Sequence, residues 1–397
     1  MWAIRCTFWI CLAWLLYTYV LYPVCLFAAA GWKQLAADLR QARGDADRRC
    51  ALAAEADLPG VSLIMAAHNE AAVLAGKLQN LSALDYPPDR LEFVLVSDGS
   101  SDGTARLLSH WGDARARCLV LPERQGKAAA LNAGVAAARH SILVFCDAAT
   151  LLEPGAIRRL VRHFAAPGVG VVCGALHFRQ SEESRHTEGL YWRYETLLRA
   201  MEARLGATPT PSGALYALRR AAFRPLPAGA LLDDLLLLWT ARRLGYGVVQ
   251  DASARGEEIA ASSVRAEFDR RVRIALGSFR ALPACWGFPM GAAVRWVFLS
   301  HKLMRWLVPW FALGLFAASL ALARQPGYRV MLALEAAVLI WAGAGALFRR
   351  WMMRIPGGLA AYFLLAMNLA LAVGLCRCLA AQAGISRAAQ VRWENAG

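Results

Sequence analysis

A single carboxylate follows a short apolar run in the middle of the chain. Residues 142–145 read ILVF, and Asp147 comes two positions later. A run of this kind is typical of a central parallel strand, and open α/β sheets bind ligands at the carboxyl ends of their strands. Asp147 is therefore a candidate ligand-holding group, although an Asp here can also simply cap the following helix.

Two earlier strand ends carry polar groups as well. Residues 61–70, VSLIMAAHNE, end in side chains that can hydrogen-bond a base or ribose, and Asn is also common in ordinary strand-to-helix turns. In residues 93–104, FVLVSDGSSDGT, Gly99 permits a tight turn and Asp98 can bind a base or ribose. Asp102 is expected to cap the next helix.

Residues 124–134, RQGKAAALNAG, place a lysine at a helix start. Gly126 lets the backbone approach a ligand, and Lys127 supplies positive charge to a phosphate. The GxxxxGK[ST] spacing of a Walker loop is absent, which argues against a P-loop ATPase. An acid pair, Asp233 and Asp234, starts the apolar stretch LLDDLLLL, where both can also serve as partners of the helix dipole.

Alternating strands and helices bring these groups to one edge of a sheet. Such alternation implies right-handed βαβ crossovers and a mostly parallel sheet, which we assign to residues 60–263. The strand candidates are 61–66, 93–97, 118–121, 142–145 and 169–173, and the helix candidates lie near 70–80, 102–111, 127–139 and 154–164.

The composition adds a membrane region. Of the 397 residues, 58% are hydrophobic and only 18% charged, too apolar for an ordinary soluble protein. The net charge of +15 follows the membrane boundaries rather than an element that reads a nucleic-acid groove, so we expect no nucleic-acid partner. The 10 cysteines show no zinc spacing and are interpreted as reduced.

Four membrane spans are expected. Residues 7–32 carry no charge and are long enough to cross a bilayer, so we predict a transmembrane helix in residues 1–32. A basic linker, residues 33–59, follows and should be cytoplasmic. Three more spans are expected within 306–381, at 306–323, 330–348 and 355–379. The basic loop 349–354 should be cytoplasmic, which puts both termini outside, although Arg387 and Arg392 of the tail, residues 382–397, fit this poorly.

Between the sheet domain and these spans, residues 264–305 mix arginines with apolar positions. Arg295, Lys302 and Arg305 fall near one face of a helical projection. We therefore predict one or two amphipathic helices on the inner membrane surface.

Taken together in this order, the four strand-end and lysine blocks resemble the family 2 inverting glycosyltransferases. The resemblance covers about residues 60–280, and the apolar segments resemble those of polysaccharide-synthesising members. It implies an α/β domain of the GT-A type that binds a nucleotide-sugar. It also implies a nucleotide-binding set of Ala67, His68, Asn69, Glu70, Asp98, Gly99, Lys127 and Asp147.

Asp147 matches the first acid of the family's D-x-D metal motif, but Ala149 stands where the second acid is expected. Mg²⁺ often takes only one or two protein carboxylates and keeps several waters. Asp147 together with two diphosphate oxygens can therefore still hold Mg²⁺ or Mn²⁺.

Further along, the resemblance makes Asp234 the general base, with Asp233 in the position of the family's adjacent Glu. A neighbouring acid and an apolar wall both raise a carboxyl pKa, which suits proton abstraction from a sugar hydroxyl. Gly213 and Ala214 match the acceptor side. Three arginines, Arg270, Arg271 and Arg273, fall at the Q-x-x-R-W motif of processive relatives and could clamp the diphosphate.

The resulting expectation is an inverting, metal-dependent transferase in the inner membrane with a cytoplasmic catalytic domain. It would move a sugar from a nucleotide-sugar, most readily a UDP-sugar, to a lipid-linked or growing envelope glycan. Export or synthase subunits are possible partners besides membrane lipids. Two alternatives stay open: transfer to a polyprenyl phosphate, and a nucleotide-binding membrane subunit without catalysis.

Overall fold

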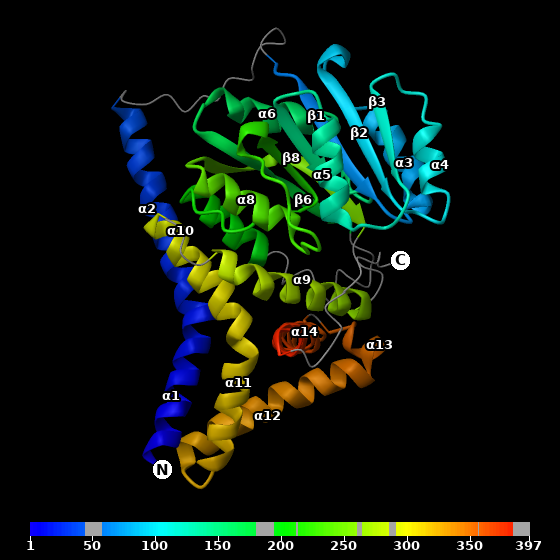
Figure 1. The fold of residues 1–397 in the computed structure, drawn as a ribbon. Coiled ribbons are helices and arrows are strands. Elements are labelled where there is room, and N and C mark those ends of the chain that lie inside the picture. The colour runs from blue at the N-terminus through cyan, green and yellow to red at the C-terminus, as the bar shows by residue number, and fades with distance from the viewer. Residues whose placement is uncertain are drawn as a thin grey trace.

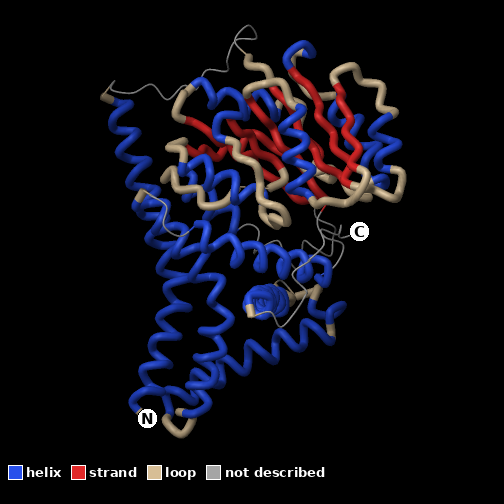
Figure 2. The backbone as a smooth tube through the Cα atoms, in the orientation of Figure 1, coloured by secondary structure: helices blue, strands red, loops and turns tan. Residues whose placement is uncertain are grey.

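The computed structural model describes residues 1–43, 58–179, 194–211, 213–259, 264–285, 291–355 and 357–383. Most of the expected basic linker and nearly all of the tail lie outside these residues. The described chain forms a sheet domain joined to a group of long apolar helices (Figure 1). Strands gather in the sheet domain, and helices alone make up the other part (Figure 2).

The first half of the sheet is parallel, as the alternating pattern predicted. Strand β1 pairs with β2 and with β4, and β2 pairs with β3. The first two strands are buried along their whole length, because helices cover both faces and neither face meets water. The strands are β1 (Val61–Ala67), β2 (Leu91–Asp98), β3 (Ala116–Leu121) and β4 (Ile142–Cys146), with helices α3 (Ala71–Ser82), α4 (Thr104–Ser109) and α5 (Lys127–Ala137) between them.

The second half of the sheet is mixed. Strand β7 inserts antiparallel between β4 and β6, and the full order is β3-β2-β1-β4-β7-β6-β8-β5. The elements are β5 (Leu151–Leu152), α6 (Ala156–Val161), β6 (Val169–Arg179), β7 (Leu215–Arg219), α8 (Asp233–Arg243) and β8 (Gly247–Ile259). Helices α3, α4 and α6 pack on one face, and α5 and α8 pack on the other.

Four helical stretches are long and apolar enough to cross a membrane: Trp2–Arg40, Ala292–Ala321, Pro326–Leu347 and Ala360–Gln382. The first consists of α1 (Trp2–Leu16), a π-helical turn (Tyr17–Leu21) and α2 (Tyr22–Ala42). The second consists of α10 (Ala292–Val297), a π-helical turn (Phe298–Leu303) and α11 (Met304–Ala321). The others are α12 (Pro326–Leu347) and α14 (Ala360–Gln382), and the short α13 (Arg349–Met352) lies between them.

The boundary drawn from the sequence at residue 305 therefore falls inside one continuous helical stretch. Helices α1 and α11 run side by side (Figure 1), and Trp14 stacks on Phe311 with ring centroids 3.9 Å apart. The guanidinium of Arg5 donates to the side-chain oxygen of Gln325 at 3.1 Å. The N-terminus and the 322–325 turn thus lie together.

A buried polar cluster joins these helices to the sheet domain. The helix over residues 194–204 contributes Glu195 and Glu202, and His301 contacts both carboxylates. Arg305 donates to Glu195 at 2.7 Å, and the hydroxyl of Tyr22 donates to Glu202 at 2.8 Å. Because buried charges are costly unless they are paired, these contacts favour one position of the domain on the apolar helices.

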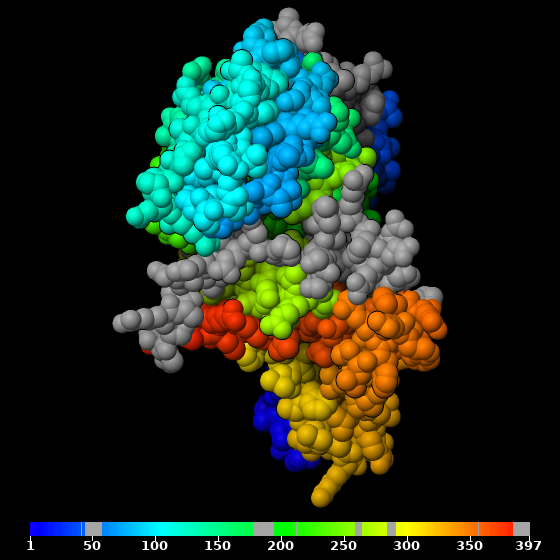
Figure 3. Space-filling view, turned by 90° about the vertical axis from the view of Figure 1, so that its right-hand side faces the viewer, coloured from blue at the N-terminus to red at the C-terminus, as the bar shows by residue number. Residues whose placement is uncertain are grey.

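Helix α9 (Val264–Cys285) lies between the sheet domain and the apolar helices α12 and α14 (Figures 1 and 3). It crosses α14 at close range, since a Cβ built on Gly374 would lie 2.5 Å from the Cβ of Ala275. This contact is possible only without a side chain at Gly374. The backbones of α9 and α14 are therefore held closer than ordinary side chains allow.

We expect Gly374→Ala to destabilise the protein by about 1–3 kcal/mol, because the added methyl group forces the two helices apart. The measurement is the unfolding temperature of the detergent-purified protein. The control is Gly343→Ala on α12, where a Cβ meets nothing within 4 Å. Equal unfolding temperatures for the two variants would contradict the close packing of α9 on α14.

Candidate active site

The end of β1 forms a hydrogen-bonded turn against the end of β2. Asn69 has a left-handed backbone (φ 55°), its N–H donates to Ser100 Oγ at 3.2 Å, and its side-chain oxygen accepts from the Ser101 N–H at 2.9 Å. His68 Nδ1 donates to the Asp98 carbonyl at 2.6 Å. Ala67 is fully buried, so its side chain is part of the core. The structure thus brings the expected nucleotide-binding turns of β1 and β2 together.

The carboxylate of Asp102 caps the N-termini of two helices, α3 and α4. Its carboxylate accepts from the Thr104 N–H at 3.0 Å and from the Ala71 N–H, also at 3.0 Å. It therefore serves the first residues of both α3 and α4. The N–H of Glu70 donates to Thr104 Oγ1 at 2.8 Å, which ties the same two helix starts.

Asp98 supports the loop that carries Lys127. Its carboxylate is completely buried and accepts from the backbone N–H groups of Gln125 at 2.7 Å and Gly126 at 2.8 Å. Gly99 is required beside it, because its φ is +58° and a Cβ there would lie 2.3 Å from the Arg124 nitrogen. A direct contact from Asp98 to a base stays a prediction, whereas its hold on this loop is observed.

Lys127 joins acids from two distant parts of the chain. Its Nζ lies 2.9 Å from Asp147 Oδ1, at the end of β4, and 3.3 Å from Asp233 Oδ1, at the start of α8. Burial alone would lower the pKa of Lys127, but Asp147 and Asp233 outweigh it and the pKa is raised. The lysine is therefore a fixed positive charge between two carboxylates.

Asp234 lies beside this group and faces the acceptor-side segment. A Cβ built on Gly213 would come within 2.9 Å of Asp234 Oδ2, and the Ala214 carbonyl accepts from the Asp147 N–H at 3.4 Å. Burial and, next, the charge of Asp233 raise the pKa of Asp234 to about 7. The structure thus assembles the two expected catalytic acids, the lone acid after β4 and both acceptor-side residues.

Tyr216 belongs to this group, although nothing in the sequence indicated it. Its hydroxyl donates to Asp233 Oδ2 at 3.2 Å, and its ring stacks on Phe145 at 4.9 Å. Tyr216 stands on β7 directly opposite Phe145 of β4. Its place depends on the antiparallel insertion of β7, so only the strand order reveals it.

One arginine of α9, Arg273, interacts electrostatically with Asp147. Burial and Arg270 lower the pKa of Arg273, while the charge of Asp147 acts in the opposite direction. Glu258, on β8, is a further acid near the site that the sequence did not indicate. Burial first, and then the charge of Asp147, raise the pKa of Glu258 to about 7.

Glu267 organises two of these arginines. Its side chain is 1% exposed, and its two oxygens accept from Arg270 Nε and Arg271 Nε, each at 2.7 Å. Burial would raise the pKa of Glu267, but the two guanidinium groups outweigh it and lower the pKa. The arginines predicted to bind diphosphate are thus held in place by one buried carboxylate.

We expect Glu267→Gln to cost about 3 kcal/mol in stability, because a charged partner is removed from a buried ion-pair group. Nucleotide affinity should also fall, since both guanidinium groups lose their orientation. Thermal unfolding and calorimetric titration with UDP measure the two effects. Asp89→Asn removes an acid whose side chain is 77% exposed in the turn before β2, and it serves as the control. Equal behaviour of the two variants would contradict this role of Glu267.

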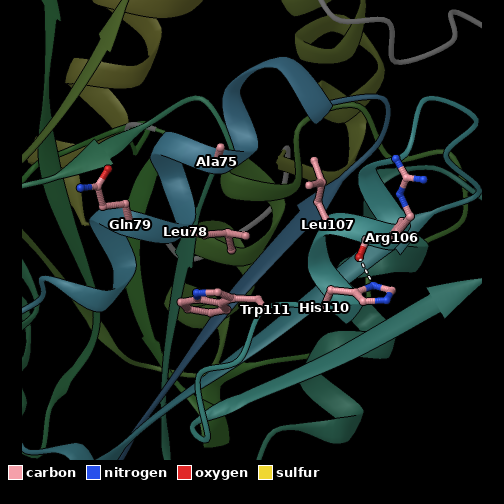
Figure 4. A pocket seen from close by; sticks show the side chains of 7 residues that line it. All are labelled: Ala75, Leu78, Gln79, Arg106, Leu107, His110 and Trp111. Carbon is pink, nitrogen blue, oxygen red and sulfur yellow. Dashed lines mark hydrogen bonds between the residues drawn. The ribbon is translucent and has the colours of Figure 1, made fainter.

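A separate apolar groove of about 580 Å³ lies between α3 and α4 (Figure 4). Leu78, Leu107 and Trp111 face it, and His110 Nδ1 donates to the Arg106 carbonyl at 2.8 Å. None of the expected site residues lines this groove. The candidate chemistry therefore belongs to the acid cluster and not to this surface.

The described residues contain no group of three or more His, Cys, Asp or Glu side chains placed to hold a metal ion. Asp147, with 38% of its side chain exposed, is the acid that opens outward. One such carboxylate fits a divalent cation whose remaining ligands are diphosphate oxygens and water.

Residues 62–226 match the family model described as glycosyl transferase family 2. The chain carries a family 2 glycosyltransferase domain. Curated relatives include poly-beta-1,6-N-acetyl-D-glucosamine synthase of Staphylococcus aureus (strain COL), 26% identical over 240 residues, which are 57% of this chain and 56% of that protein. The synthase of the same name from Staphylococcus epidermidis is 23% identical over 236 residues, 56% of this chain and 55% of that protein. The chain thus aligns with little more than half the length of these relatives.

The family 2 domain also has a solved structural neighbour. The mannosyltransferase PcManGT from Pyrobaculum calidifontis, solved in complex with GDP-Man and Mn²⁺, superposes with a TM-score of 0.67. It is 23% identical, and the superposition covers 90% of this chain and 97% of that one. The GT-A type fold expected from the sequence is confirmed.

Proposed function

We propose that this chain is a membrane-bound inverting glycosyltransferase. It takes a sugar from a nucleotide-sugar, with UDP-sugars as the first candidates, and transfers it to a hydroxyl of a lipid-linked or growing glycan. The names of the staphylococcal relatives make UDP-N-acetylglucosamine a donor to test. The long apolar helices support a site at a membrane. We place the sheet domain on the cytoplasmic side of the inner membrane, because basic segments such as residues 349–354 mark cytoplasmic loops.

The observation that carries this proposal is the contact of Lys127 with both Asp147 and Asp233. These three residues come from separate elements, α5, β4 and α8, and meet at the carboxyl end of β4. A fold that needed the acids only as helix partners would not bring them within reach of one ammonium group. This grouping supports one site that binds an anionic donor and activates an acceptor.

The chain's own residues then have distinct tasks. Asp147 would hold Mg²⁺ or Mn²⁺, and such an ion supplies positive charge that offsets the negative charge of a departing nucleotide. Lys127 and the α9 arginines place further positive charge around the diphosphate. Asp234 accepts the acceptor's hydroxyl proton on its carboxylate, because burial and Asp233 give it a pKa suited to a base near neutral pH.

The proposed transfer inverts the configuration at the anomeric carbon, as the resemblance to the inverting family 2 enzymes implies. Gly213 lies directly against Asp234, since a Cβ there would come within 2.9 Å of Oδ2. An acceptor hydroxyl held at this carboxylate would attack the anomeric carbon from the side opposite the nucleotide. The bond to the nucleotide oxygen breaks as the new glycosidic bond forms, and the nucleotide diphosphate leaves with the electron pair. Tyr216 holds Asp233 during this step through its hydroxyl.

The direct test is a donor screen with the purified full chain in detergent. Mg²⁺ or Mn²⁺ and a lipid extract as acceptor would be supplied with UDP-N-acetylglucosamine, UDP-glucose and GDP-mannose, and nucleotide release would be measured. We expect release from one donor well above the others, and glycan product of inverted configuration. Binding of nucleotides without any release would favour a non-catalytic subunit.

The rate should depend on pH through Asp234. A base must be deprotonated to accept a proton, so the rate should rise with pH and level off above an apparent pKa near 7. Below that value each pH unit should cost about tenfold in rate. The measurement is kcat/KM for the donor found above between pH 5.5 and 9. A rate that falls steadily as the pH rises through 7 would contradict the assignment.

A further inference from the structure

A lysine with no part in the proposed chemistry lies wholly inside the domain. Lys77, on α3, has 0% exposed surface. Its Nζ donates to the carbonyl oxygen of Thr150. Across the described part of the chain, no carboxylate is within ion-pair distance of Lys77.

A buried lysine without an acid partner lowers the stability of the folded protein. Burying an ammonium group without an acid partner is unfavourable, and an apolar side chain of similar length usually fills such a place at less cost. The neighbours of Lys77 on the same helix, Leu74, Leu78 and Leu81, are ordinary core residues. Packing alone therefore does not account for a lysine at this position.

The lysine reaches the back of the turn that carries Asp147. The Thr150 N–H donates to the Asp147 carbonyl at 3.2 Å, so Asp147 and Thr150 are the two ends of one turn. Lys77 holds the Thr150 end from inside the domain. Lys127 holds the Asp147 carboxylate from the other side, at 2.9 Å. The ammonium groups of Lys77 and Lys127 therefore hold the two ends of this turn.

We propose that Lys77 is a positioning residue for Asp147. By fixing the Thr150 carbonyl, it sets the turn so that the Asp147 carboxylate faces Lys127 and the diphosphate. The position of the Asp147 carboxylate is important for metal binding, because Ala149 supplies no second carboxylate that could compensate for a displaced Asp147. This inference rests on the proposed function, in which Asp147 acts through a divalent cation and a nucleotide diphosphate.

The test compares UDP binding with and without Mn²⁺, by calorimetric titration of the purified full chain. In Lys77→Met we expect the affinity for UDP with Mn²⁺ to fall about tenfold, the loss expected for one hydrogen bond from a charged donor. The affinity for UDP alone should stay within about twofold. The unfolding temperature should be unchanged or higher, because a buried charge has been removed. Lys77→Arg keeps a charged donor and should retain most of the Mn²⁺-dependent affinity.

The control is Asn80→Ala on the same helix. Asn80 donates to the Leu152 carbonyl and accepts from the Leu152 N–H, both at 2.8 Å, so it supports the fold near the turn without bearing charge. This variant should unfold at a lower temperature and keep the Mn²⁺ effect on UDP binding.

Three results would overturn the proposal. In the first, Lys77→Met binds UDP with Mn²⁺ as tightly as the wild type. In the second, Lys77→Met fails to fold, which would assign the lysine to the fold. In the third, the wild type binds neither UDP nor GDP in either condition, and then the proposed function itself fails. A loss confined to the Mn²⁺-dependent affinity would support the role of Lys77.

Discussion

Asp234→Asn should reduce sugar transfer by about 10³-fold or more and leave nucleotide binding within about threefold of the wild type. General-base catalysis contributes about 10²–10⁴-fold to rates, and an amide cannot accept the proton. The shape of the site is kept, because Asn is nearly isosteric with Asp and the Leu235 N–H can still donate to the side-chain oxygen. Single-turnover transfer and UDP titration separate the two effects.

A surface acid supplies the matched control for this variant. Asp89 has 77% of its side chain exposed and lies in a short turn between α3 and β2, so Asp89→Asn should transfer at the wild-type rate. If Asp234→Asn also kept its rate, a phosphate acceptor would be favoured over a hydroxyl. A phosphate already carries its negative charge and needs no strong base to attack. This result would select the polyprenyl-phosphate alternative.

Lys127→Met should have the second largest effect, with kcat/KM at pH 7 falling by about 10²-fold. Two losses combine in this variant. The donor diphosphate loses a charge-assisted contact, which is stronger than a neutral hydrogen bond. The carboxylates of Asp147, Asp233 and Asp234 also lose the cation that offsets their mutual repulsion.

The pH profile distinguishes this explanation from a simple loss of binding. Lys127 lowers the pKa of Asp234 by its charge, so its removal should raise that pKa further above the ordinary carboxyl range. The acidic limb of kcat/KM should then move to higher pH than in the wild type. Lys127→Arg restores the charge and should return the limb toward its original position. An acidic limb that moved to lower pH in Lys127→Met would show that the lysine does not act on Asp234.

The polar cluster around His301 relates the two parts of the chain. Glu195 and Glu202 come from the helix over residues 194–204, whereas Tyr22 and His301 come from the long apolar helices. These contacts hold the sheet domain on the long apolar helices. The acceptor-side residues Gly213 and Ala214 come nine and ten positions after the end of the 194–204 helix.

Local sequence patterns were sufficient to predict much of the fold and several residues of the candidate site. The short apolar runs indicated five of the strands, β1, β2, β3, β4 and β6, and the polar residues after three of them indicated the edge on which the candidate groups lie. Uncharged stretches such as residues 7–32 indicated the long apolar helices. Burial of both sheet faces requires continuous apolar runs in the strands, and the thickness of a bilayer requires long uncharged helices. Both constraints act on residues that are adjacent in sequence, so the sequence alone reveals them. Asp147 and the pair at Asp233 could therefore be singled out without coordinates.

Pairings between distant segments were decided by the tertiary structure alone. That Lys127 contacts both Asp147 and Asp233 depends on the docking of α5 and α8 against β4. The roles of Tyr216, Glu267 and Lys77 depend on strand order, on helix placement and on burial of a single charge. None of these leaves a local motif, because a side chain's partner across a sheet or beneath a turn is set by packing and not by its neighbours in sequence.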